Sequence, residues 1–158
     1  MKIENSFTVD ATPDRVFAYL LDLDQVVGCI PGATLEEVVD SKTFRGTLKV
    51  KVGPVQMTYR GTARLLEVEE NEDQGSATAR VEGDARDVRG ADSVRGSMAL
   101  TVAADGEGTK VDMSADVNVT GRVSQFGRGM VEDVSRRLVR QMAACLQDRL
   151  AADGGGGA

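Results

Sequence analysis

The chain has 158 residues, of which 41% are hydrophobic, 28% are charged and 4% are aromatic, and it contains no histidine and no tryptophan. This length fits one globular domain, which can bury most of its surface without disulfides or a structural metal. The absence of histidine excludes His-based general bases, catalytic triads and imidazole metal ligands. The 19 basic and 25 acidic residues give a net charge of −6, the wrong sign for a nucleic-acid-binding protein.

No segment has the length and apolarity of a membrane span, and the N-terminus opens on a strand pattern rather than a signal peptide. We therefore expect a cytoplasmic protein. Cys29 and Cys145 match no metal-binding or redox spacing, so we interpret both as reduced, buried thiols in a reducing compartment. Residues 1–150 are expected to form one domain, followed by a flexible glycine-rich tail at 151–158.

The first thirty residues predict one strand and two short helices. Residues 3–9 alternate between apolar and polar side chains, which is typical of a strand. Thr12, Pro13 and Asp14 form a helix-start signal, and apolar residues then recur at helical spacing. A second helical turn is predicted at 24–27, before the chain meets glycine and proline.

Period-two alternation dominates from residue 34 to 120 and predicts an antiparallel sheet of about seven strands in all. Gly53-Pro54 and Asp105-Gly106 are its turn signals. Two charged runs, at 67–73 and 84–92, are interpreted as solvated loops, the second as a flexible flap. Besides a weak strand at 34–39, the predicted strands are 43–52, 55–65, 77–83, 94–102 and 111–119.

Residues 122–150 place apolar side chains at spacings of three and four, which predicts a long amphipathic helix. This helix is the one predicted element long enough to cover the apolar face of the sheet. Its six arginines stand against three acidic residues. The group Arg136, Arg137 and Arg140 is interpreted either as a solvated helix back or as a contact for an acidic partner or an anionic membrane surface.

The inward-facing positions of the five clear strands are unusually small. Of 24 such positions, eight are glycine or alanine and none is charged. One interpretation is an elongated apolar ligand cavity, since protein interiors are otherwise closely packed. The other is that the glycines serve bulges and bends of a curved sheet. The eight are Gly46, Gly61, Ala63, Ala77, Ala79, Gly83, Gly96 and Ala115.

An uncharged interior favours binding over catalysis, because acid, base and nucleophilic groups are missing from it. The hydroxyls of Tyr59 and Tyr19 are candidates to hold a ligand head group, or else they bond to the backbone. Five of the six methionines fall on predicted apolar faces, where flexible thioethers suit a lipid-like ligand or form ordinary core. These are Met57, Met98, Met113, Met130 and Met142.

Four segments carry a resemblance to a known family. They are Ala11–Phe17, Cys29–Ala33, the hairpin Lys51–Val55, and Gly121–Met130 at the opening of the last helix. With the order of strand, two helices, six strands and long helix, the chain resembles the START/Bet v 1-like (SRPBCC) superfamily. The segments narrow this resemblance to the CoxG family of carbon monoxide dehydrogenase proteins. The resemblance implies an α+β helix-grip fold, a curved seven-stranded antiparallel sheet wrapped on the C-terminal helix.

The resemblance further implies a non-catalytic accessory protein of molybdenum-containing carbon monoxide dehydrogenase, lying at the inner face of the cytoplasmic membrane. Relatives resemble this chain extended by a linker and a membrane-binding C-terminal segment. Because such a dehydrogenase delivers electrons to respiration, we expect the cavity to hold a membrane isoprenoid quinone, menaquinone or ubiquinone. The alternatives are a recruitment or maturation factor without ligand transfer, and a cyclase-like enzyme.

The expected ligand contacts come from strand positions facing the cavity, from both tyrosines and from the last helix. No catalytic residue and no metal ligand is expected. The candidates are Tyr19, Leu48, Met57, Tyr59, Gly61, Ala79, Val81, Gly96, Met98, Met113, Phe126, Met130 and Val134.

Overall fold

The computed structural model describes residues 1–90 and 92–155, which form one antiparallel sheet, one long helix and several short helical segments. The strands are β1 (Lys2–Val9), β2 (Ala33–Asp40), β3 (Thr43–Val52), β4 (Val55–Asn71), β5 (Ser76–Asp87), β6 (Ser93–Asp105) and β7 (Gly108–Thr120). The helices are α1 (Pro13–Leu21), α2 (Leu23–Val26) and α3 (Gly127–Gly155), with 3-10 turns η1 (Val27–Cys29), η2 (Glu72–Gln74) and η3 (Arg122–Phe126).

The sheet order is β1-β7-β6-β5-β4-β3-β2, and every neighbouring pair is antiparallel. Strands β2 to β7 are therefore successive hairpin neighbours, while β1 pairs with the last strand. Gly53 and Gly106 adopt φ values of 59° and 61° at two of the turns, as the sequence signals predicted. The expected seven-stranded helix-grip architecture is confirmed.

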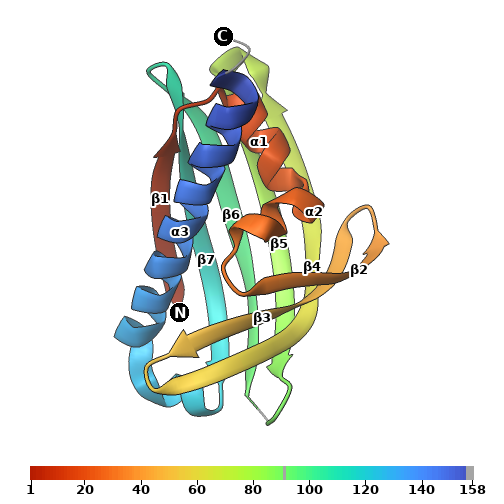
Figure 1. Cartoon of the computed structure of the whole chain (residues 1–158), viewed down its shortest axis with the longest axis vertical. Helices are drawn as coiled ribbons and strands as arrows, with labels where there is room; N and C mark the ends of the chain where they lie inside the picture. The colour runs from red at the N-terminus through yellow and green to blue at the C-terminus, as the bar shows by residue number, and fades with distance from the viewer. Residues whose placement is uncertain (91, 156–158) are drawn as a thin grey trace.

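Helix α3 lies along the concave side of the sheet, with α1 and α2 beside its C-terminal half (Figure 1). The buried side chains form two clusters. One joins α1 to the C-terminal half of α3 and the middle strands, and it includes Val16, Phe17 and Leu146. The other lies near the start of α3 and includes Met57 and Val123. The interior between helix and sheet is thus packed at both ends.

Glycines of neighbouring strands stand opposite one another where the sheet curves. Gly46 pairs with Gly61, and Gly83 pairs with Gly96. A Cβ added at Gly96 would lie 2.6 Å from the carbonyl oxygen of Asp116, and one at Gly46 or Gly61 would meet backbone even more closely. These three glycines are therefore required by the close approach of backbones, as the second interpretation held.

The last helix differs from its predicted span. Residues 122–126 form the separate turn η3, and α3 begins at Gly127 and continues to Gly155. Gly121 and Gly127 adopt φ values of 89° and 84°, so the backbone leaves helical geometry on either side of η3. The part of the expected tail at 151–155 continues this helix, and residues 156–158 lie outside the described residues.

Both charged runs are largely strand, so their interpretation as loops was wrong. β4 continues to Asn71 and β5 to Asp87, because these residues pair with each other in one long hairpin. The turn after β5 carries the expected glycine, and residue 91 within it lies outside the described residues. Its flanking residues Asp87 and Asp92 are 5% exposed, which a solvated flap does not explain.

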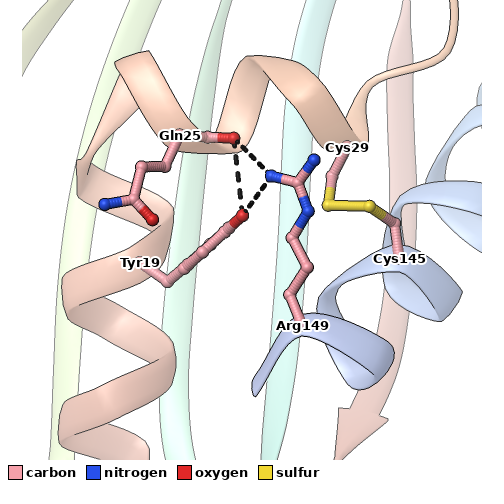
Figure 2. The surroundings of a disulfide bond; sticks show 5 residues. All are labelled: Tyr19, Gln25, Cys29, Cys145 and Arg149. Atoms are coloured by element: carbon pink, nitrogen blue, oxygen red, sulfur yellow. Dashed lines mark hydrogen bonds between the residues drawn. A yellow bond between two sulfur atoms is a disulfide. The ribbon is translucent and has the colours of Figure 1, made fainter. Parts of the chain in front are cut away.

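The interpretation of the cysteines as reduced thiols was also wrong. Cys29 in η1 and Cys145 in α3 form a disulfide with a Cα–Cα distance of 5.4 Å (Figure 2). The two residues are 116 positions apart, and no local spacing announces the bond. Only the packing of η1 against α3 brings the sulfur atoms together, and the disulfide removes the ground on which a reducing compartment was expected.

Candidate functional site: an apolar cavity between helix and sheet

A cavity of about 620 Å³ lies between α3 and the sheet. Its floor comes from the inward positions of β3 to β7, and α3 closes one side with Val134 and Leu138. The short segments α2 and η1 supply another wall through Val26, Val27 and Ile30. The volume falls within the range of roughly 300–1,000 Å³ that is usual for small-molecule sites.

The small strand residues do border this cavity. Gly46, Gly61, Gly83 and Gly96 all lie on its wall. The two interpretations of the glycines therefore hold together, since close backbone approach curves the sheet and the missing side chains leave the space empty. Alanines add to this effect at three further wall positions: Ala63, Ala85 and Ala115.

Seven of the thirteen expected ligand contacts lie on the cavity wall: Leu48, Tyr59, Gly61, Val81, Gly96, Met98 and Val134. Their contact with a ligand stays a prediction.

The remaining six lie elsewhere, so their placement in the cavity was wrong. Met57 is fully buried in the core cluster near the start of α3, and Phe126 and Met130 pack against that cluster. Ala79 and Met113 belong to the opposite cluster. Their strand parity was correct, but packing at the two ends of the sheet consumes these positions.

Tyr19 is also outside the cavity. Its hydroxyl donates to the carbonyl oxygen of Gln25 at 3.4 Å and accepts from Nη1 of Arg149 at 2.5 Å (Figure 2). This is the backbone-bonded alternative that was left open for the tyrosines. Sequence reasoning missed the wall formed by α2 and η1, whose signal was the apolar run Val26, Val27 and Ile30 before Pro31.

Tyr59 lies on the cavity wall in a different environment. It is 6% exposed, and its hydroxyl oxygen has no hydrogen-bond partner among the described residues. Burial raises the pKa of this phenol above its ordinary value, and the nearby carboxylates of Asp92 and Asp87 raise the pKa further. The hydroxyl is therefore a neutral group whose hydrogen-bonding capacity is unused.

An ion-pair cluster lies between the turn after β5 and the start of η3. The guanidinium of Arg122 contacts Asp92 at 3.0 Å and Asp87 at 3.3 Å. The Arg122 backbone N–H donates to Asp92 at 2.6 Å, and Asp87 accepts from the Thr58 backbone N–H at 3.2 Å. These bonds from Arg122 hold the pKa of Asp92 below its ordinary value. The cluster thereby ties β4, the end of β5 and η3 together.

The exposed arginines of α3 make separate contacts. Arg136 pairs with Asp133 at 3.0 Å, and Arg137 donates to the backbone carbonyl of Lys51 at 3.2 Å. Arg140 is exposed. Arg137 therefore also fastens α3 to the end of β3, while the expectation of an acidic partner or membrane contact stays a prediction.

Among the described residues, no group of acidic or cysteine side chains has the arrangement to hold a metal ion. Over the same part of the chain, no helix is long and apolar enough to span a membrane.

A curved antiparallel sheet that encloses an apolar cavity against one long helix defines the Bet v 1/START-like helix-grip class. The chain is 18% identical to a conserved protein from Geobacillus kaustophilus, with a TM-score of 0.78 and coverage of 96% of each chain. A STAR-related lipid transfer protein from Xanthomonas axonopodis gives 16% identity and a TM-score of 0.63, covering 91% of this chain and 84% of that one.

The ZhuI aromatase/cyclase from Streptomyces sp. R1128 is 17% identical with a TM-score of 0.61, covering 95% of this chain and 93% of that one. At these identities the likeness shows the fold alone. No curated protein matches the chain. Residues 6–151 match the carbon monoxide dehydrogenase CoxG family, and the chain belongs to that family.

Proposed function

We propose that this domain is a non-catalytic accessory protein of a molybdenum-containing carbon monoxide dehydrogenase that carries a lipophilic ligand, a membrane isoprenoid quinone such as menaquinone or ubiquinone. The observation that carries the proposal is the apolar cavity of about 620 Å³. Membership of the CoxG family supports the enzyme partner. An electron-delivering enzyme needs an acceptor, and a quinone taken from the membrane into this cavity would supply one.

The polarity of the wall suits a ligand with a long hydrocarbon part. Val81, Val117 and Leu138 are representative wall residues, and each offers only hydrocarbon to the cavity. Three charged residues also border the cavity, but Arg45 and Asp84 are exposed and Glu82 pairs with Arg64 at 3.2 Å. The cavity therefore lacks an acid and base placed to act on a ligand, which favours carriage over cyclase-like catalysis.

Tyr59 supports a ligand that also carries an oxygen acceptor. A buried hydroxyl without a partner costs about 1–3 kcal/mol, and a carbonyl group of a bound ligand would remove that cost. A quinone head group presents such carbonyls. We therefore expect the head to lie near Tyr59 and the prenyl chain to extend along the valine-rich and glycine-rich wall.

The test is organic extraction of the protein, purified after exposure to quinone-containing membranes, followed by mass spectrometry. We expect a bound quinone, and a preparation free of quinone and other lipid would contradict the proposal. Ala63→Phe and Ala115→Phe fill the cavity and are expected to abolish ligand recovery. Ala144→Phe, on the exposed part of α3, is the matched control and should leave recovery unchanged.

The same variants separate carriage from recruitment alone. Under the proposal, filled-cavity variants still bind the dehydrogenase but no longer support electron transfer to membrane quinone. If electron transfer remains intact in those variants, the domain is a recruitment or maturation factor whose cavity is incidental.

A further inference from the structure

The disulfide lies next to a wall of the cavity. Cys29 is preceded by Val26 and Val27 and followed by Ile30, and all three line the cavity. Cys145 belongs to α3, whose residues Leu138 and Val139 line the opposite side. The disulfide therefore connects two walls of the cavity covalently, as the position of the sulfur atoms between η1 and α3 shows (Figure 2).

The wall that carries Cys29 has little stability of its own. Helix α2 has four residues and η1 has three, so neither can persist without tertiary contacts. Within α2 and η1, Val26 and Cys29 are the buried residues. The next fixed point is Gly32, whose carbonyl oxygen accepts from the Lys49 backbone N–H at 2.9 Å. Segment 27–31 thus depends on the disulfide for its attachment to α3.

A second, non-covalent attachment lies beside the disulfide. Nη1 of Arg149 donates to the Tyr19 hydroxyl at 2.5 Å and to the Gln25 carbonyl oxygen at 3.1 Å. A Cβ at Gly28 would lie 2.8 Å from the Arg149 guanidinium, so glycine lets this side chain lie against η1. Tyr19 belongs to α1, whose buried face is part of the core. If the disulfide is broken, this network still holds the segment to α3 and limits the change to local opening.

We propose that the Cys29–Cys145 disulfide is a redox-controlled clasp on the wall formed by α2 and η1, and that its reduction by a dithiol speeds ligand exchange. This inference rests on the proposed function of the cavity. The thiolate of the reductant attacks one sulfur of the Cys29–Cys145 bond and forms a mixed disulfide. Its second thiol then displaces the protein sulfur, so both cysteines become thiols and the reductant becomes a disulfide. Segments of low local stability open most readily, and the clasp acts on such a segment.

The test measures exchange of a neutral apolar fluorophore, N-phenyl-1-naphthylamine, by stopped-flow displacement from the oxidised and the dithiothreitol-treated protein. Thiol titration confirms the state of each sample. We expect release to be on the order of tenfold faster after reduction, as for other locally opening segments. The double variant Cys29→Ser/Cys145→Ser should release the fluorophore at the reduced rate and should not respond to dithiothreitol.

Hydrogen exchange of segment 23–32 gives an independent readout. We expect faster exchange there after reduction, while β5 and β6 stay protected. Equal release rates and equal exchange in the two redox states would overturn the clasp, as would a disulfide that resists dithiothreitol in the folded protein. If the fluorophore binds neither state but segment 23–32 still opens on reduction, the proposed ligand fails and the clasp stands. Should the double variant fail to fold, the treated wild-type protein carries both measurements.

Discussion

The Cα of Gly61 in β4 faces the carbonyl oxygen of Asp84 in β5 so closely that a Cβ at position 61 would overlap this oxygen. The sheet bends at this point, and Gly61 also pairs with Gly46 on its other side. A residue on the cavity wall is therefore also a residue that the backbone requires to be glycine. Substitutions there test the sheet, and the cavity has to be tested at the alanines.

Gly61→Ala is accordingly expected to lower the free energy of unfolding by about 2–4 kcal/mol, because the new methyl group forces two strands apart. Urea denaturation measures this change. Gly129→Ala is the matched control, since a Cβ there meets no atom within 4 Å and the position lies in α3. Alanine at 129 should leave the stability unchanged or raise it by up to about 1 kcal/mol. Equal effects at both positions would refute the backbone explanation.

Breaking the disulfide is expected to lower the stability of the whole domain. Cys29 and Cys145 are 116 residues apart, so the bond constrains much of the unfolded chain. Such bonds contribute about 2–5 kcal/mol. Urea denaturation of the wild-type protein should shift to lower midpoints with dithiothreitol, whereas Cys29→Ser/Cys145→Ser should give one low midpoint under both conditions. A wild-type midpoint unaffected by reduction would show that the bond adds no stability.

The Tyr59 hydroxyl is expected to add nothing to the stability of the ligand-free protein, because it has no hydrogen-bond partner among the described residues. Tyr59→Phe should therefore leave the free energy of unfolding unchanged or raise it by about 1 kcal/mol, while weakening quinone binding several-fold. Tyr19→Phe is the comparison, since its hydroxyl bonds to Arg149 and Gln25. That variant should lose about 0.5–1.5 kcal/mol. The reverse order of stabilities would contradict the assigned hydrogen bonding.

The pH dependence of stability is expected to involve Asp92. Bonds from Arg122 lower the pKa of this carboxyl from its ordinary value of 3.8, and a group with a lowered folded pKa stabilises the protein above its unfolded pKa. This contribution is lost as the pH falls through the lowered folded value. Asp92→Asn should therefore lower the thermal midpoint at pH 7 and make it less sensitive to acid below about pH 5.

Asp105→Asn in the exposed β6–β7 turn is the control for Asp92→Asn and should behave as the wild type does. An unchanged acid response in the Asp92 variant would show that the pair with Arg122 does not govern acid unfolding.

Much of the fold followed from local patterns. Alternation over 43–52 and 111–119 marked strands whose observed bounds contain them, and Thr12-Pro13-Asp14 marked the start of α1. These features depend on neighbours in sequence, so sequence reasoning could find them. Strand parity also identified Leu48, Val81 and Met98 as wall residues of the cavity. Parity could not show where along each strand the core ends and the cavity begins, so Met57 and Met113 were misplaced.

The composition of the chain by itself determined a small-walled, uncharged inner face without histidine chemistry. Tertiary structure alone decided that Cys29 meets Cys145, that Arg122 meets Asp87 and Asp92, and that the glycines are required by backbone contact. The physical reason is that each of these contacts joins residues about 20 or more positions apart. Their proximity depends on the curvature of the whole sheet around α3, which no local sequence pattern encodes.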